Sequence, residues 1–241
     1  MEDKIQGVVL QSIRYGESSL VVKIYTRQAG LQSYLVKGVA GRAAHHRAAL
    51  FQPMTFLQFV QSGRSRPNSL SYLKEPELQY AYQSIPMVMN KTAILIYLSE
   101  LLSHTLTQQE QNEDLYQFVY QSVVWLDLVE SQYANFPLFF TLELTRFLGF
   151  YPQSAEPGKP FFDLMEGRFV AVAPPHPYWL DGEQSALVAS LLQRPIDEMA
   201  SVVLNGVQRN QLLDGLLTFV RLHAPMVKGL QSHEILKEVL R

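Results

Sequence analysis

The first eighty residues contain short apolar runs in which buried and exposed positions alternate. Leu20, Val22 and Ile24 would share one side of an extended chain, and Lys23 would lie on the other. A period of two is typical of a β-strand with one buried face. The alternation and the intervening turn residues predict five strands, at Ile5–Tyr15, Leu20–Thr26, Gln32–Val39, Met54–Gln61 and Leu70–Lys74.

Five short strands in such a stretch indicate a small barrel. A five-stranded OB-fold is the simplest fit, although other small barrels would give the same alternation. Gly16, Gly30 and Pro76 are among the residues expected to end strands. OB-fold barrels commonly bind single-stranded nucleic acid on one face.

From about Ser84 the apolar positions recur with a helical period. The apolar stripes of these segments are interpreted as core. In the first predicted helix the stripe runs from Met87 to Leu102. The predicted helices are Pro86–Leu106, Leu115–Val129, Asn135–Gly149, Leu187–Leu192, Ile196–Leu204, Gln211–Leu222 and Glu234–Leu240.

Polar residues at the ends of these segments predict helix boundaries. Asn112 is a candidate N-cap, and Asn135 followed by Pro137 resembles a helix start. Asp181 and Gln184 have the spacing of a capping box. Asn205-Gly206 is interpreted as a helix stop or turn.

A proline-rich stretch, Tyr151–Pro177, interrupts the helices and predicts one short hairpin. Its strands are expected at Phe161–Leu164 and Arg168–Ala171. The predicted fold class is therefore α+β. Residues 1–80 form an OB-fold domain, and residues 81–241 form an all-helical domain with a hairpin insertion at about 151–180.

Composition narrows the chemistry. The 241 residues include no cysteine, which excludes disulfides, thiolate catalysis and cysteine-ligated zinc. No apolar window is long enough to cross a bilayer, and the acidic start at Met1–Lys4 is unlike a signal peptide. We therefore expect a cytoplasmic protein without a membrane partner.

Charge is sorted along the chain, whose formal net charge is only −2. Residues 1–80 carry a net +5, and residues 81–241 a net −7. A basic stretch on an acidic protein predicts a polyanionic partner. Between Ser18 and Lys74 there is no acidic residue, and the cations are Lys23, Arg27, Lys37, Arg42, Arg47, Arg64, Arg66 and Lys74.

The sequence contains no credible active site. It has no phosphate-cradling glycine loop, no His-Glu-x-x-His and no Gly-x-Ser-x-Gly. His45-His46 could ligate a metal, but a basic neighbour and the lack of a nearby carboxylate favour phosphate contact. Glu113-Asp114 fits a helix N-terminus better than acid–base catalysis. We expect neither enzymatic activity nor a metal or other cofactor.

The basic stretch supplies the candidate binding residues. Two lie in predicted strands, Lys23 and Lys37. The others are assigned to two inter-strand loops, one with Arg42, His45, His46 and Arg47, the other with Arg64 and Arg66. Tyr25, Tyr34 and Tyr72 could stack on bases, although packing is the favoured role of each. Cations that contact phosphate would bind without sequence preference.

Several segments resemble a known family. The run Gly16–Val22, followed by Tyr25-Thr26, Gly30 and Leu35–Val39, is similar to the opening of the RecO family of bacterial recombination-repair mediators. The similarity continues through Arg42–Arg47 and Ala49–Met54. In the helical part, Phe140–Pro152 is similar to the family's Phe-rich helix ending in Leu-Gly-aromatic-x-Pro.

The resemblance implies an N-terminal OB-fold and a helical C-terminal domain. It implies binding of single- and double-stranded DNA, annealing of complementary strands, and cooperation with RecR and the C-terminal tail of the single-strand-binding protein. The outcome would be loading of RecA onto DNA, at the nucleoid of a bacterial cytoplasm. The residues alone leave open an OB-fold RNA-binding protein or a protein-interaction module.

The chain departs from the family in two places. Many members carry a four-cysteine zinc site in the insertion, whereas Tyr151–Pro177 has no cysteine, so zinc is not expected. The family tends to place basic residues just before the position of Phe140, where this chain has Leu138-Phe139. Lys91 and Arg146 are then the candidate contacts for a partner tail.

Overall fold

The computed structural model describes residues 4–39, 45–62, 70–106, 110–156, 158–227 and 229–240, with only the backbone described at 45, 46 and 200. Two compact units divide the chain. One comprises Met1–Val88 and Leu98–Asp127, and the other comprises Met89–Tyr97 and Leu128–Arg241. The change from strands to helices falls between the last barrel strand and Ile85.

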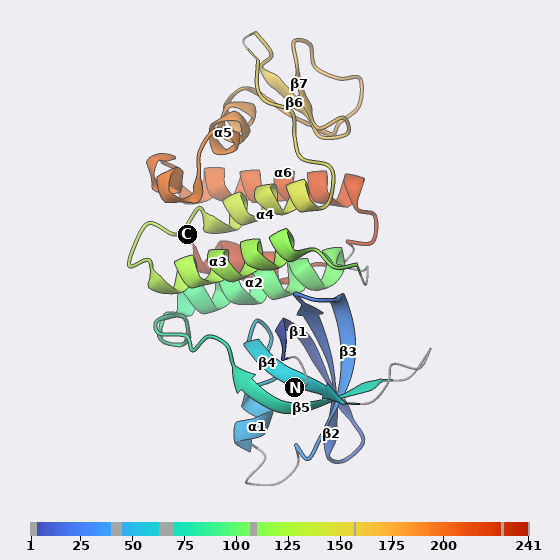
Figure 1. The fold of residues 1–241 in the computed structure, drawn as a ribbon. Coiled ribbons are helices and arrows are strands. Elements are labelled where there is room, and N and C mark those ends of the chain that lie inside the picture. The colour runs from blue at the N-terminus through green and yellow to red at the C-terminus, as the bar shows by residue number, and fades with distance from the viewer. Residues whose placement is uncertain are drawn as a thin grey trace. The chain divides into compact units, whose positions relative to one another are not determined.

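The first unit contains a closed five-stranded barrel (Figure 1). Its strand order is β1-β2-β3-β5-β4, with the β3–β5 pair parallel and the other pairs antiparallel. A closed barrel of five strands confirms the predicted OB-fold. The strands are β1 (Ile5–Tyr15), β2 (Ser19–Thr26), β3 (Gly30–Lys37), β4 (Phe56–Ser62) and β5 (Ser71–Leu78). The short helix α1 (His45–Ala49) lies between β3 and β4 in sequence.

The alternation seen in the sequence builds the barrel interior. Val22 and Ile24 are fully buried, and Lys23 between them is exposed. Gly7 permits close strand packing, since a Cβ there would lie 2.4 Å from the Ile24 methyl group. The buried cluster comprises Val9, Val22, Ile24, Tyr34, Val36, Phe51, Leu57, Phe59 and Leu73.

Pro76 does not end the last strand, contrary to prediction. β5 continues to Leu78, with an irregular register between Gln58 and Val60 on the neighbouring strand. Glu75, next to the proline, has a φ of 50°. A bulge tolerates a residue that lacks a ladder N–H, so the proline fits inside the strand.

Two long helices after the barrel follow the predicted apolar stripes. α2 (Met89–Thr105) buries Leu98, Leu101 and Leu102, and α3 (Glu113–Leu128) begins at the predicted cap. The Asn112 side chain accepts the Leu115 N–H at 2.9 Å. Met87 was assigned to the stripe, but it lies in the short 3₁₀ helix η2 (Ile85–Met87) and is 85% exposed.

The second unit is mainly helical. Its small sheet has the order β7-β6-β8, from β6 (Phe161–Asp163), β7 (Arg168–Val170) and β8 (Trp179–Leu180). The hairpin was predicted and the third strand was not. The helices are α4 (Phe136–Phe147), α5 (Gly182–Leu192), α6 (Gly206–His223) and α7 (Ser232–Val239), with the 3₁₀ helix η3 (Ile196–Ser201).

Two helix-end predictions were wrong. Asp181 precedes α5, but its side chain makes no capping hydrogen bond. Asn205 starts α6 instead of ending a helix. Its side chain accepts the Gln208 N–H at 2.9 Å, and Gln208 Oε1 accepts the Asn205 N–H at 2.9 Å. This reciprocal pair is a capping box.

None of the helices in the described residues is both long and apolar enough to span a membrane.

Candidate nucleic-acid interface

The outer surface of β1, β2 and β3 carries two of the predicted cations. Lys23 is opposite Gln11 on one side and Ser33 on the other, and Lys37 is opposite Ser19. Both lysines are exposed because their neighbours in the strands point into the barrel. Neither forms an ion pair with any carboxylate in the described ranges, so both charges are available to an anionic ligand.

Lys37 also contacts an aromatic side chain. Its ammonium nitrogen lies 4.7 Å from the centroid of the Tyr72 ring on β5. Tyr72 is 40% exposed. A cation held over a ring at this distance is a cation–π contact, which orients the lysine without neutralising it.

The other two tyrosines suggested for stacking are in the protein interior. Tyr25 and Tyr34 are 2% and 1% exposed. Both therefore pack in the core, which was the favoured role in the sequence analysis. Burial raises the pKa of each to about 12. Of the three, Tyr72 alone presents ring surface to a ligand.

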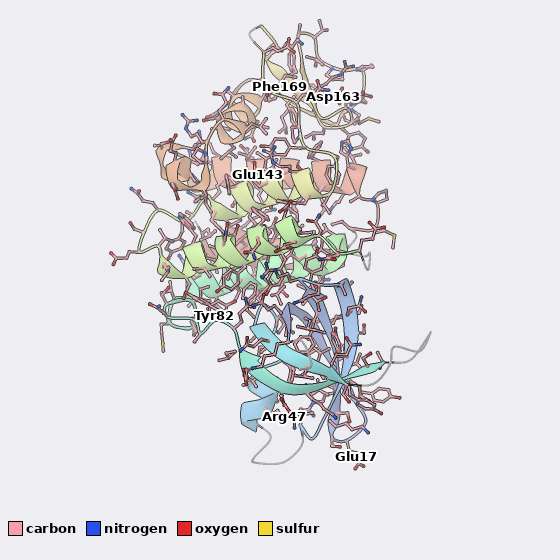
Figure 2. All side chains as sticks on the ribbon, viewed as in Figure 1. Glu17, Arg47, Tyr82, Glu143, Asp163 and Phe169 are labelled. Carbon is pink, nitrogen blue, oxygen red and sulfur yellow. The ribbon has the colours of Figure 1, made fainter. Side chains whose placement is uncertain are left out.

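Arg47 lies on α1 and not in a loop, because residues 45–49 are helical. Figure 2 labels it beside the barrel. Its guanidinium packs near Gly38, where a Cβ would lie 3.7 Å from the Nη1 atom. The Nε atom is buried and has no hydrogen-bond partner within the described part of the chain. The residue as a whole is half-buried, so part of the guanidinium can reach an anionic ligand, but the buried Nε cannot without a movement of the side chain.

The remaining predicted contacts are not placed. His45 and His46 form the start of α1, without described side chains. Arg42, Arg64 and Arg66 lie outside the described residues. Their assignment to DNA contact stays a prediction.

Two barrel cations outside the predicted site have internal partners. Arg27 pairs with Glu113 at the start of α3, with 3.0 Å between Nε and Oε1. Lys4 pairs with Glu77 at 2.6 Å. Arg27 and Lys4 therefore differ from Lys23 and Lys37, which pair with no described carboxylate.

A carboxylate that the sequence did not single out organises the segment after the barrel. Asp127 is 1% exposed and accepts hydrogen bonds from the N–H groups of Gln83, Ser84 and Ile85 at 2.8–2.9 Å. The Tyr80 hydroxyl donates to it at 2.8 Å. In the sequence, Asp127 could have been noticed only as a single acidic residue that follows an apolar run. Its role is structural.

Both candidate partner contacts in the second unit already have interactions. Lys91 is 2% exposed and donates to the Val129 carbonyl at 2.6 Å. Arg146 lies 3.7 Å from the centroid of the Tyr151 ring and bonds to Glu143 at 3.1 Å. Hydrogen bonding to Glu143 raises the pKa of Arg146. Arg146 is the more accessible of the two.

The same unit contains a gap of only about 10 Å³, beside a cation that pairs with no described carboxylate. Leu138, Leu213 and Leu236 are among its lining residues, together with Arg209. Within the described residues the Arg209 guanidinium donates to neutral oxygens only, of which the Asn135 side-chain oxygen is 3.1 Å away. Burial lowers the pKa of Arg209, although a guanidinium remains charged.

The small sheet packs on aromatic side chains. Phe162 is fully buried, with ring centroids 4.9 Å from Phe169 and 5.7 Å from Phe219. Figure 2 shows Phe169 and Asp163 in this sheet. The described residues include no group of three His, Cys, Asp or Glu side chains that could hold a metal ion.

Comparison with known proteins identifies the family. The model for the N-terminal part of recombination protein O matches residues 1–82, and the model for its C-terminal part matches residues 88–230. Curated relatives named DNA repair protein RecO occur in Flavobacterium psychrophilum, 33% identical, and Phocaeicola vulgatus, 31% identical, each covering 99% of both chains. Another, from Christiangramia forsetii, is 32% identical over 97% of both chains.

Each of these relatives is named for DNA repair and none for a catalytic activity. The two family models together cover the barrel and most of the helical part. An OB-fold with unpaired surface cations is consistent with a role in DNA repair. By its sequence, the chain belongs to the RecO family of DNA repair and recombination proteins.

Proposed function

We propose that this protein binds single-stranded DNA through its barrel, anneals complementary strands, and acts without a catalytic centre as a recombination mediator. With RecR and the single-strand-binding protein, it would help to load RecA. The supporting observation is the pair of exposed lysines, Lys23 and Lys37, that no described carboxylate neutralises. Duplex DNA is expected to bind the same cations through its phosphates.

Annealing follows from charge neutralisation. Two complementary strands repel each other through their phosphates, and lysines and arginines on one surface reduce that repulsion. Contacts to phosphate carry no sequence information, so any complementary pair would be accepted. No bond is made or broken, which is consistent with the lack of a catalytic motif.

The second unit is the proposed site for partner proteins. The half-buried Arg209, which pairs with no described carboxylate, supports binding of an acidic tail, such as that of the single-strand-binding protein. Arg146 remains a second candidate contact, whereas the burial of Lys91 favours an internal role.

The binding site is tested by removing two arginines together. The double variant Arg42→Ala and Arg47→Ala should weaken single-stranded DNA binding for all sequences. The plot of log affinity against log salt should become less steep by about 0.7 for each lost phosphate contact. Fluorescence anisotropy over a salt series measures both. Arg168→Ala, an exposed cation of the second unit, is the matched control. An unchanged slope would remove these arginines from the site.

The mediator role is tested by annealing complementary oligonucleotides coated with the cognate single-strand-binding protein. Annealing of coated strands is expected. Naked-strand binding without annealing of coated strands would reduce the role to DNA binding alone. Preference for structured RNA would favour the RNA-binding alternative, and no binding to any nucleic acid would favour a protein-interaction module.

A further inference from the structure

We infer that the outer face of β1, β2, β3 and β5 is a stacking platform for the unpaired bases of a single strand. Its principal contacts are Tyr15, Tyr72 and Ile13. This inference rests on the proposed function and extends it, because it assigns base contacts to residues that carry no charge. It predicts that single strands bind more tightly than duplexes.

Strand register brings these side chains together. Ile13 pairs with Val21, Val21 with Leu35, and Leu35 with Tyr72. The four residues therefore form one row across four adjacent strands, with neighbours about 4.8 Å apart. The next row along the strands holds Tyr15, Ser19 and Lys37, which are paired in that order.

Both rows face outward. Ile13, Tyr15 and Tyr72 are 50%, 61% and 40% exposed, whereas the alternate positions Val22 and Val36 are fully buried. Apolar and aromatic side chains gathered on an open sheet face indicate a binding surface. Aromatic rings present a flat face to any base, so stacking is tolerant of sequence.

Cations border the row on both sides. Lys23 lies one row away in one direction, and Lys37 lies one row away in the other, over the Tyr72 ring. Rings flanked by unpaired lysines match a nucleic-acid strand, whose bases are apolar on their faces and whose backbone is anionic. A second copy of the same face would instead bring lysines against lysines, which disfavours self-association.

Single strands and duplexes would use this surface differently. In a duplex the base faces are stacked on one another, so only phosphates reach the lysines. In a single strand the bases can rotate onto Tyr15 and Tyr72. Loss of the rings should therefore affect single-strand binding alone.

The test uses the double variant Tyr15→Leu and Tyr72→Leu, which keeps exposed apolar side chains but removes the rings. The dissociation constant for an oligothymidine should rise about tenfold for each ring removed. The duplex constant and the salt slope for the single strand should both stay at wild-type values. Tyr178→Leu, a 42% exposed tyrosine of the second unit, is the control. Circular dichroism confirms that each variant is folded.

The outcomes separate this inference from the function on which it rests. Salt-sensitive DNA binding by the wild type, with no effect of the ring substitutions, would overturn the platform and leave the DNA-binding function intact. Equal losses on single and duplex DNA would also overturn it. If the wild-type chain bound no DNA at all, both proposals would fail.

Discussion

At the scale of single residues, Asp127 shows how one buried charge can organise a segment. Burial by itself would raise its pKa, but hydrogen bonds from Gln83, Ile85, Ser84 and Tyr80 together lower it below the ordinary value. A carboxylate with this many donors is stabilised in its ionised form. It holds the segment after β5 against the end of α3.

Asp127→Ala should lower the free energy of unfolding at neutral pH by about 3 kcal/mol, because buried N–H donors lose their acceptor. Because the pKa of Asp127 is lowered in the folded state, its carboxylate contributes fully to the free energy of unfolding above about pH 4. This contribution is lost as pH falls through the lowered value. The difference between wild type and variant in urea unfolding should therefore shrink in acid. Glu130→Ala, an exposed acid beyond the same helix, should show neither effect.

At the scale of elements, the starts of α5 and α6 show that a cap depends on geometry as well as residue type. Asp181 and Asn205 both precede a helix and both have a glutamine three residues later. Only Asn205 forms the reciprocal bonds. The sequence pattern therefore favoured the wrong one of two similar sites.

These two caps provide a matched pair of substitutions. Asn205→Ala should destabilise the protein by about 1 kcal/mol, since the first turn of α6 loses a side-chain acceptor. Asp181→Ala should lower the free energy of unfolding by only about 0.3 kcal/mol, because it removes a charge near a helix N-terminus but no capping hydrogen bond. Chemical denaturation of both variants measures the difference. Equal costs would show that the capping box contributes nothing.

At the scale of the whole molecule, distant segments meet to support the small sheet. Phe150 follows α4, and Phe219 and His223 come from α6. Phe150 stacks on His223 with centroids 5.1 Å apart, and Phe219 contacts Phe162 of the sheet. An aromatic cluster drawn from three separate parts of the chain thus supports the sheet.

Because packing supports the sheet, Phe162→Ala should lower the free energy of unfolding by about 3–5 kcal/mol. A chelator should leave the thermal transition of the wild type unchanged. Val172→Ala, at a site 78% exposed in the same insertion, should have little effect. Differential scanning calorimetry distinguishes these cases, and a transition lowered by chelation would contradict a metal-independent fold.

The sequence by itself determined the elements whose signal is local. The spacing of apolar residues predicted the five strands and the central parts of the long helices. Alternating spacing favours an extended backbone, and helical spacing favours a helix. The uneven distribution of charge along the chain showed that the first eighty residues are basic. Motifs such as Gly16–Val22 indicated the family. Which lysines are unpaired was not determined.

Only the tertiary structure decided how residues far apart in sequence are combined. Arg27 and Lys23 look alike in the chain, but Arg27 meets Glu113 across 86 positions and Lys23 meets no described carboxylate. Tyr72 and Tyr34 differ because strand register turns one outward and the other inward. Long-range contacts depend on strand pairing and packing, and local sequence patterns do not specify either of them.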